Sequence, residues 1–267
     1  MPDKNLKALI KYLKTLDNSI IAYSGGVDSS FLVRAAQMSG IRFLAVTSMS
    51  ETMPRQDLEN SKMITARFGI PHRVIRTYEL TDSNFAENPP DRCFYCKDNL
   101  FRRLEKIAGA DDYDHILDGS NTDDTNDFRP GLRANKKHGI ISPLVITGMN
   151  KEDIRNLSRT LGLPTWDRPS SPCLSSRFPY GIEITPSGLE MVSRAEDYLM
   201  SLGFRIVRVR TSGATATIEV GVAEIGPLLT ESIRSKVIRE FKNIGYRDIL
   251  IDLEGYRSGN LNRSINH

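Results

Sequence analysis

The sequence predicts an α/β fold in which helices cover a parallel β-sheet, followed by a smaller α+β unit. Up to about residue 165, short apolar runs typical of strands alternate with longer segments of helical periodicity. A segment rich in proline and serine, 164–181, interrupts this alternation, and the order of elements changes after it. A glycine loop follows the first of these apolar runs, and sheets of this kind bind ligands at the carboxyl ends of their strands.

The first unit is expected to open with an amphipathic helix and to continue as strands and helices in turn. The apolar face of the opening helix consists of Leu6, Leu9, Ile10, Leu13 and Leu16. Strands are expected at 20–23, 42–47, 73–76, 114–118 and 140–141, and helices at 27–39, 54–68, 96–108 and 150–161. Because strands joined by helical crossovers pair in parallel, this order predicts a Rossmann-like sheet.

The remainder of the chain has a different pattern. A helix is expected at 185–202, strands at 205–210 and 214–220, a helix at 224–242 and a strand at 248–251. Thr185-Pro186 suits an N-cap followed by proline at the first helical position. We therefore expect a first domain at 1–165, a linker with a cysteine-containing loop at 166–184, and a smaller α+β domain at 185–267.

Composition excludes several classes of protein. Hydrophobic residues make up 39% and charged residues 26% of 267 residues, as in ordinary globular proteins. The net charge of +3 is too small to indicate a nucleic-acid partner. No apolar stretch is long enough to span a membrane, and the N-terminus does not read as a signal peptide. We expect a cytoplasmic protein without a membrane or nucleic-acid partner.

The glycine loop has the sequence Ser24-Gly25-Gly26-Val27-Asp28-Ser29-Ser30 and lies between an expected strand and an expected helix. Adjacent glycines allow close approach of an anion, and the helix N-terminus favours phosphate. The serines add hydroxyl donors, and Asp28 can hold a cation that bridges phosphate oxygens. The loop lacks the lysine of G-x-x-x-x-G-K-[ST] loops. The alternative is an ordinary capped turn between a strand and a helix.

The chain has three cysteines, namely Cys93, Cys96 and Cys173. In a cytoplasmic protein, such a pattern favours metal or catalytic chemistry over disulfides. One interpretation is that all three are incidental small apolar residues. A second makes Cys173 a reactive thiol, with Arg177 and helix ends able to lower its pKa. A third gives all three thiolates to one cluster, and the spacing does not distinguish an iron–sulfur cluster from zinc.

Motifs along most of the chain resemble a known family. They are SGGVDSS at 24–30, DGSNTDD at 118–124, FRPGLRA at 128–134, SPL at 142–144, LGLPTWDRPSSPCLSSRFPYG at 161–181 and DLEGYRSGNLN at 252–262. From about residue 10 to 262, the chain resembles the LarE-type ATP-dependent sulfur transferases of the PP-loop superfamily. The segment around Cys173 and the DLEGYRSG ending are the specific matches, because other adenylating synthetases share the first loop.

The resemblance implies a two-step reaction. The family uses MgATP to adenylate a carboxylate of pyridinium-3,5-dicarboxylate mononucleotide, releasing pyrophosphate, and then forms a thiocarboxylate for a nickel-pincer cofactor. Single-cysteine members give up the sulfur of the cysteine that matches Cys173. Members with cysteines matching Cys93, Cys96 and Cys173 resemble enzymes with a sulfide-carrying [4Fe-4S] cluster, so the resemblance favours that route here. It also implies a sulfur donor, either a cysteine desulfurase or sulfide, and a homo-oligomer.

Further candidate residues lie outside the loop and the cysteines. Arg208 and Arg210 alternate on an expected strand, so both lie on one face, which is either solvated or, as the resemblance implies, a site for the substrate phosphate. Asp123 and Asp124 follow a strand end, where they bind metal or ribose or form a solvated turn. The resemblance adds Glu196 and Glu219 as acidic residues near a magnesium ion. It also adds Arg257 as a candidate phosphate ligand and Arg177 as a residue that binds substrate or tunes the Cys173 thiolate.

Two other functions fit parts of this pattern. A tRNA-thiolating PP-loop enzyme shares the ATP chemistry but typically adds an RNA-binding module or a strongly basic face. An adenylating synthetase of the NAD or GMP type shares the first loop alone. A third alternative is a non-catalytic scaffold that binds a cluster or a nucleotide, and the intact loop with Asp28 argues against it.

Overall fold

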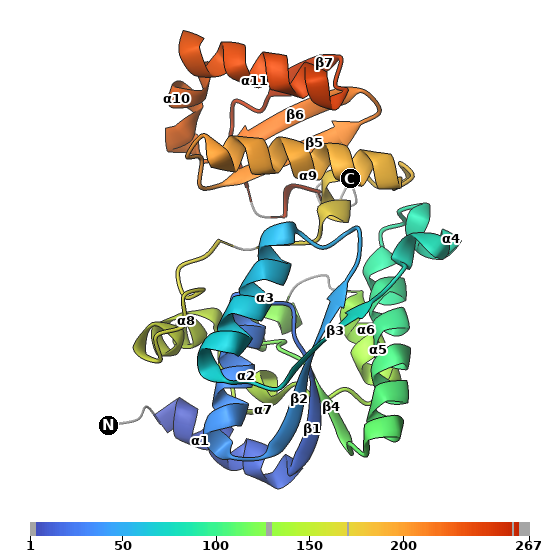
Figure 1. Cartoon of the computed structure of the whole chain (residues 1–267), viewed down its shortest axis with the longest axis vertical. Coiled ribbons are helices and arrows are strands. Elements are labelled where there is room, and N and C mark those ends of the chain that lie inside the picture. The colour runs from blue at the N-terminus through green and yellow to red at the C-terminus, as the bar shows by residue number, and fades with distance from the viewer. Residues whose placement is uncertain (1–3, 127–129, 170, 258, 262–267) are drawn as a thin grey trace. The chain divides into compact units, whose positions relative to one another are not determined.

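The computed structural model describes residues 4–126, 130–169, 171–257 and 259–261 (Figure 1). The motif residues Phe128, Arg129, Ser170, Ser258 and Asn262 lie outside the described residues. The chain forms two compact units, Met1–Glu79 with Asp91–Ser171, and Leu80–Pro90 with Pro172–His267. The boundary at Ser171 lies inside the stretch expected as a linker. The inclusion of 80–90 in the second unit differs from the sequence-based division at 165.

The first unit is built on a parallel sheet with the strand order β3-β2-β1-β4. The strands are β1 (Asn18–Ala22), β2 (Arg42–Met49), β3 (His72–Arg76) and β4 (His115–Leu117). In register, Ile20 lies opposite Leu44 on one side and Ile116 on the other. The expected fifth strand at 140–141 is reduced to a single bridge between Leu117 and Ile141. Because β1 lies between β2 and β4, the strand order reverses at β1, where such sheets bind ligands.

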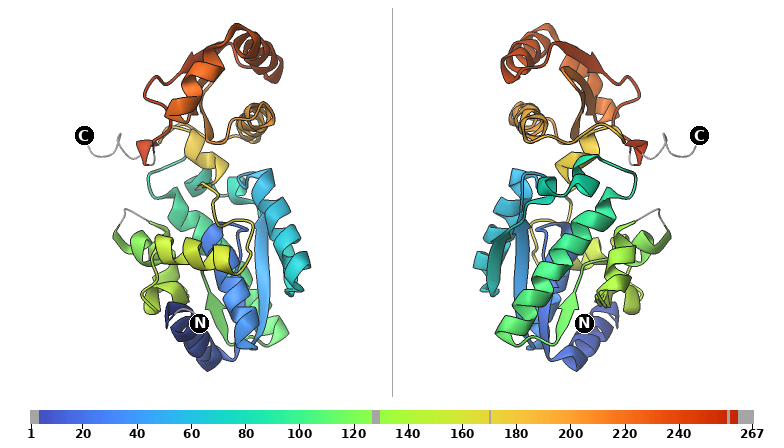
Figure 2. Two further views of the ribbon diagram at one scale, coloured as in Figure 1. Left: turned by 90° about the vertical axis from the view of Figure 1, so that its left-hand side faces the viewer. Right: turned by 90° about the vertical axis from the view of Figure 1, so that its right-hand side faces the viewer.

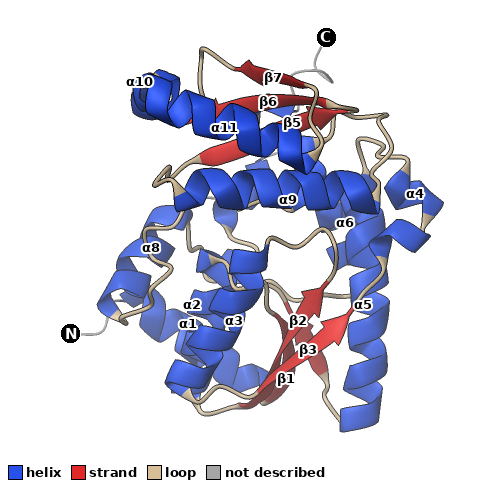
Figure 3. Ribbon diagram, turned by 45° about the horizontal axis from the view of Figure 1, so that its top comes forward, coloured by secondary structure: helices blue, strands red, loops and turns tan. Residues whose placement is uncertain are grey.

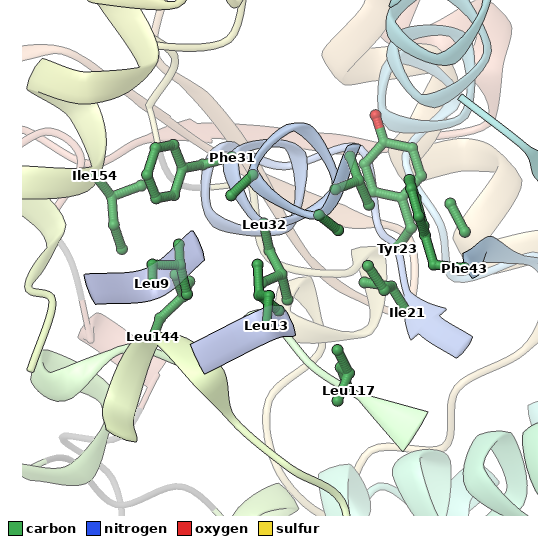
Figure 4. Close-up of a cluster of buried hydrophobic side chains, with 14 of the residues drawn as sticks. Leu9, Leu13, Ile21, Tyr23, Phe31, Leu32, Phe43, Leu117, Leu144 and Ile154 are labelled. Carbon is green, nitrogen blue, oxygen red and sulfur yellow. The ribbon is translucent and has the colours of Figure 1, made fainter. Parts of the chain in front are cut away.

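Helices cover both faces of this sheet, as Figure 3 shows for α3 and α5. They are α1 (Lys4–Leu13), α2 (Val27–Ser39), α3 (Arg55–Phe68), α5 (Arg92–Asp111), α6 (Gly131–Lys137), α7 (Pro143–Ile146) and α8 (Lys151–Thr160). Alternate residues of β1 point to opposite faces. Ile21 packs with α1, α2 and α8 in one core, part of which Figure 4 shows, and Ile20 packs with α5 and α6 in the other.

The second unit has a three-stranded sheet with the order β5-β6-β7. Its elements are α4 (Ser83–Ala86), α9 (Pro186–Ser201), β5 (Val207–Ser212), β6 (Thr215–Val220), α10 (Ile225–Leu229), α11 (Glu231–Ile244) and β7 (Asp248–Ile251). The strand β6 is antiparallel to β5 and parallel to β7. The N-cap prediction is confirmed, since Thr185 Oγ1 accepts a hydrogen bond from the Gly188 amide. The helix expected at 224–242 is divided at Thr230 into α10 and α11.

Among the described residues, α9 and α11 cover one face of the small sheet. Val209, Ile218 and Phe241 belong to a core shared by the sheet, α9 and α11, and Figure 2 shows these two helices on the same side of the strands. The other face carries Arg208 and Arg210, as strand alternation requires. No helix within the described ranges has the length and apolar character needed to cross a membrane.

Candidate active site

Two glycines shape the loop that follows β1. Gly25 has a φ of +77°, and a Cβ atom there would overlap the backbone oxygen of Asp57 in α3. Glycine is therefore required both by the backbone and by the neighbouring helix. Gly26 is the N-cap of α2, and no side chain of the described residues caps this helix. The first amides of α2 and its positive dipole end are thus oriented to receive an anion.

The three serines of the loop have different surroundings. Ser24 is exposed, and its Oγ lies 3.0 Å from Ser29 Oγ and accepts a hydrogen bond of 3.3 Å from the Gly26 amide. Ser30 is buried, with its Oγ 3.4 Å from the Tyr23 hydroxyl. Burial raises the pKa of Tyr23 to about 12, so its phenol stays protonated. Ser29 is also buried, but its hydroxyl lies beside that of the exposed Ser24, whereas the Ser30 hydroxyl faces Tyr23. Ser24 and Ser29 are therefore the better candidates for phosphate.

Asp28 has the features of a cation ligand. Its Oδ2 forms an ion pair with Lys151 of α8, while its buried Oδ1 accepts no hydrogen bond from the described residues. Burial raises the pKa of the Asp28 carboxyl, Lys151 opposes that shift, and the nearby Asp124 adds to it. Two carboxylates that interact electrically, one with a buried oxygen lacking a donor, fit a hard cation such as Mg²⁺.

The segment after β4 lies against the glycine loop. Gly119 packs so closely on the loop that a Cβ atom there would lie 3.0 Å from the Cα of Ser29. Asp123 accepts a hydrogen bond of 2.9 Å from the Lys151 amide, and Asp124 accepts one of 3.1 Å from the Asn121 amide. The carboxylates of Asp123 and Asp124 are thus held in a structured 3₁₀ turn, 122–126.

Asp118 organises the carboxyl end of β4. Its side chain is 8% exposed and accepts hydrogen bonds from Lys97 (3.2 Å), Asn135 (2.7 Å), Ser120 (2.6 Å) and Ser142 (2.6 Å). Burial alone would raise the pKa of this carboxyl, but Lys97 and the hydrogen bonds outweigh burial and lower it. Asp118 is therefore an ionised hub that joins β4 to α5 and α6.

Cys93 and Cys96 lie at the start of α5, which begins at Arg92 and not at Cys96 as expected. Neither cysteine is in a disulfide, and Cys93 is exposed while Cys96 is half-buried. Gly131 of α6 packs against this turn, since a Cβ atom there would lie 2.9 Å from Lys97 Cδ. The C-x-x-C turn is thus held by α6 and by the bond from Lys97 to Asp118.

Cys173 belongs to the second unit and precedes the 3₁₀ turn η4 (Leu174–Arg177). Its thiol is half-buried and not in a disulfide. Among the described residues, no three His, Cys, Asp or Glu side chains form a group able to hold a metal ion. The prediction of one cluster on Cys93, Cys96 and Cys173 therefore stays a prediction.

Arg177 and Glu196 form a buried ion pair. Arg177 Nε and Nη2 donate to the two oxygens of Glu196 at 2.8 and 2.7 Å, and Glu196 Oε1 also accepts a bond of 2.9 Å from the Val209 amide. Burial opposes the charge of Arg177, but Glu196 outweighs it and raises the pKa of the guanidinium. Arg177 and Glu196 are thus each other's main charged partners. Their roles implied by the resemblance, Arg177 toward the substrate or the Cys173 thiolate and Glu196 near a magnesium ion, stay predictions.

Arg208 and Arg210 lie together on the polar face of the small sheet, as predicted. Arg210 forms a bidentate pair with Glu219 at 3.0 and 2.9 Å, and its Nη1 donates to the backbone oxygen of Ser176 at 2.6 Å. The Arg208 guanidinium is buried and stacks on Tyr256 at 5.0 Å. Burial lowers the pKa of Arg208, and the neighbouring Arg177 lowers it further. Three guanidiniums and two carboxylates leave this cluster with an excess of positive charge.

Glu219 and Arg257 also have charged or polar partners within the second unit. Both oxygens of Glu219 accept from Arg210, and Oε1 also accepts from Asn260. The expected place of Glu219 near a magnesium ion stays a prediction. Arg257 pairs with Asp252 at 3.6 Å and with Glu254. Residues 252–256 run beside β6, with the Asp252 amide donating to the Ile218 oxygen and the Tyr256 amide to the Val220 oxygen.

Two polar residues near these sites escaped the sequence interpretation. Lys151 lies 123 residues from Asp28 in the chain, so no local spacing could connect the two. Asn88 is fully buried, has a φ of 57°, and donates to the backbone oxygens of Phe178, Pro179 and Ile182. The Asn88-Pro89-Pro90 run was the one local signal for a special backbone conformation.

Comparison with known proteins separates the families that share the glycine loop. The chain is 34% identical over 259 residues to the pyridinium-3,5-bisthiocarboxylic acid mononucleotide synthase of Lactiplantibacillus plantarum, covering 96% of this chain and 93% of that protein. The chain belongs to the LarE-type sulfur transferases. It is also 40% identical to an uncharacterized protein of Synechocystis sp., over 99% of each chain. No family model matches the chain.

The wider PP-loop superfamily matches over a shorter part. A tRNA-specific 2-thiouridylase of Rickettsia africae is 26% identical over 57% of this chain and 52% of its own length. The LarE-type match extends over both units, whereas this match covers little more than half of the chain. LarE-type membership therefore accounts for the second unit as well as for the glycine loop.

Proposed function

We propose that the protein uses ATP to adenylate a carboxylate of pyridinium-3,5-dicarboxylate mononucleotide and converts it to a thiocarboxylate for a nickel-pincer cofactor. The observation that carries the proposal is the match to a synthase of the bisthiocarboxylic product over nearly the whole of both chains. The shaped loop at β1, and three cysteines without disulfides, support the two halves of the reaction.

The first half-reaction is an attack on the α-phosphate of ATP. A carboxylate oxygen of the substrate bonds to that phosphorus, and the bond to the oxygen bridging the α- and β-phosphates breaks. Pyrophosphate leaves with the electron pair, and the substrate becomes an acyl adenylate. Amides at the start of α2 and the hydroxyls of Ser24 and Ser29 are placed to neutralise charge on the phosphates.

Asp28 and Asp124 are the proposed protein ligands of a magnesium ion. Magnesium usually takes one or two carboxylates and completes its shell with phosphate oxygens and water, which suits this pair. When bound, the ion would neutralise charge on the leaving pyrophosphate. Lys151 holds Asp28 Oδ2 and supplies a second positive charge beside the phosphate site.

The second half-reaction brings sulfur to the activated acyl group. We propose that Arg208 and Arg210 bind the substrate phosphate, since the arginine cluster carries excess positive charge. Arg257 is a further candidate. A sulfur nucleophile attacks the acyl carbon, the bond from that carbon to the AMP oxygen breaks, and AMP leaves with the electron pair.

For the origin of the sulfur, we favour the route through a [4Fe-4S] cluster held by Cys93, Cys96 and Cys173. Such a cluster would have one open iron able to carry a sulfide, recharged by a cysteine desulfurase or by free sulfide. In the other route Cys173 forms a thioester, a base removes its α-proton, and the bond from its Cβ to sulfur breaks. The thiocarboxylate then departs and dehydroalanine remains. The three-cysteine pattern of the chain supports the first route.

Anaerobic purification followed by iron and acid-labile sulfide analysis separates the two routes. The cluster route predicts about four irons and four or more sulfides per chain. Iron-free protein that loses the mass of hydrogen sulfide from Cys173 after one turnover would establish the sacrificial route instead.

Pyrophosphate release tests the function itself. We expect release from MgATP that depends on the pyridinium dicarboxylate mononucleotide, with no release on adding tRNA or nicotinate adenine dinucleotide. Release with tRNA, together with retention of tRNA at physiological salt, would favour the thiouridylase alternative. Size-exclusion chromatography tests the expected homo-oligomer, and cell fractionation tests the expected cytoplasmic location.

A further inference from the structure

The Cys173 turn is held by an unusually buried cation. Arg177 is 1% exposed and is among the largest fully buried side chains of the described residues. Moving a guanidinium out of water is strongly unfavourable unless its donors are satisfied. The hydrogen-bond donors of Arg177 must therefore be satisfied by neighbouring acceptors. The identity of these acceptors indicates the role of the side chain.

The donors of Arg177 divide into two sets. Nε and Nη2 face Glu196, as described above. Nη1 donates to the backbone oxygens of Pro172 at 2.8 Å and of Cys173 at 3.1 Å, and to Ser176 Oγ at 2.9 Å. The guanidinium therefore binds residues at both ends of the turn 172–177, which contains Cys173.

The other end of this contact is anchored in the small sheet. Glu196 of α9 accepts the Val209 amide of β5, and Val209 lies between the two arginines proposed to bind the substrate phosphate. Arg210 binds the same turn from the sheet side through the Ser176 oxygen. A continuous chain of hydrogen bonds thus connects the Cys173 backbone to β5.

We propose that Arg177 and Glu196 are positioning residues that fix Cys173 at a set distance and orientation from the phosphate-binding arginines of β5. This inference rests on the proposed function. It replaces the idea that Arg177 binds the substrate and that Glu196 binds a metal. A lysine could not do the same work, because one ammonium cannot span a carboxylate and two carbonyl oxygens in fixed directions.

The two half-reactions should therefore depend on Arg177 to different degrees. Adenylation needs the loop of the first unit and a substrate whose phosphate is bound by Arg208 and Arg210, but it needs no contact between Arg177 and the reacting carboxylate. Sulfur delivery depends on where the Cys173 turn lies, and small misplacements of reacting groups cost large factors in rate. Loss of the Arg177–Glu196 pair should therefore uncouple the two half-reactions, leaving acyl adenylate that does not become thiocarboxylate.

The test compares Arg177→Lys and Glu196→Gln with wild type in the full-length chain. The control is Arg194→Lys, which makes the same chemical change at a half-exposed arginine of the same helix as Glu196. We expect thiocarboxylate formed per pyrophosphate released to fall about tenfold or more in the two variants. Pyrophosphate release and its KM for the mononucleotide should stay within about twofold, as in the control.

A role in binding the substrate phosphate would instead raise KM and slow pyrophosphate release in parallel with sulfur transfer, and would overturn the proposal. So would an unchanged ratio of product to pyrophosphate, or loss of the folded state in both variants. Hydrogen exchange gives a readout that needs no substrate. Amides of 172–178 should exchange faster in both variants, while those of α5 stay unchanged.

If wild type releases no pyrophosphate with this substrate, the proposed function fails. The exchange measurement still decides whether Arg177 and Glu196 hold residues 172–178 in place. Unchanged exchange at 172–178 would show that Arg177 does not hold the turn, whatever the substrate.

Discussion

At the scale of single residues, the glycine loop is constrained more tightly than its sequence suggests. Gly25 and Gly40 have the same φ of +77°, but only Gly25 faces a neighbour, the Asp57 backbone, while nothing lies within 4 Å of a Cβ at Gly40. The two positions therefore separate the cost of backbone conformation from the cost of overlap.

We expect Gly40→Ala to cost about 1–2 kcal/mol of unfolding free energy, from backbone conformation alone. Gly25→Ala should cost about 1–3 kcal/mol more, because α3 must move, and it should also weaken ATP binding. Urea denaturation and calorimetric titration with MgATP measure the two effects. Equal costs at the two glycines would show that the contact with Asp57 does not constrain the loop.

The ion pair of Asp28 and Lys151 predicts a pH dependence. Burial raises the pKa of the Asp28 carboxyl, and Lys151 counteracts the shift. Because Asp28 must be ionised to hold magnesium, activity should fall as pH drops through this raised pKa. Lys151→Met removes the counteracting charge, so the acidic limb of pyrophosphate release should move to higher pH.

Lys151→Arg serves as the control, since it keeps the positive charge and should leave the acidic limb near its wild-type position. If the methionine and arginine variants share one acidic limb, Lys151 does not set the ionisation of Asp28.

At the scale of elements, Asp118 is the residue that fastens the C-x-x-C helix to the sheet. Its folded pKa lies below the ordinary value of 3.8. The stability that it contributes is therefore present above that ordinary value and is lost as pH falls through the folded pKa. Lys97, on α5 directly after Cys96, is the charged partner that maintains this state.

Lys97→Met should destabilise the protein by about 1–3 kcal/mol at neutral pH, because a buried carboxylate loses its cation. The difference from wild type should shrink in acid, where Asp118 takes up a proton in both proteins. Urea denaturation at several pH values measures this, with Lys106→Met on the exposed face of the same helix as control. A pH-independent difference would assign the loss to packing.

At the scale of the whole molecule, the hydrophobic interior is divided between two units. Phe241 lies in the core of the second unit, and Leu32 lies in a core of the first. The single tryptophan, Trp166, belongs to the first unit and reports on it alone. Separate cores predict that unfolding of this chain need not be a single two-state transition.

Phe241→Ala should lose about 3–5 kcal/mol in the second unit. We expect the urea transition followed by far-UV circular dichroism to shift, while the transition followed by Trp166 fluorescence stays in place. Leu32→Ala should move the fluorescence transition. Coincident shifts of both probes in both variants would mean that the two units unfold as one.

The sequence was a good guide wherever function depends on neighbours in the chain. The helix expected at 27–39 is α2, and its loop has the predicted glycine geometry, because strand, turn and helix propensities act over a few residues. The alternation of Arg208 and Arg210 placed both on one face for the same reason. The prediction of a strand at 140–141 was wrong, since the segment forms a single bridge to Leu117. A local apolar pattern does not reveal how many backbone hydrogen bonds a segment makes to the neighbouring strand.

What the sequence by itself determined is a family pattern that spans the chain, and from that pattern it predicts a loop for phosphates and cysteines for sulfur. Only the tertiary structure decided how charges are paired. Arg177 and Glu196 each matched a ligand role, yet they lie against each other, because a buried ion requires an opposite charge whose position depends on packing. Lys151 reaches Asp28 from a distant helix for the same reason. Electrostatic attraction depends on the distance between two charges in the folded chain. The local sequence around one charged residue does not show which opposite charge lies close to it.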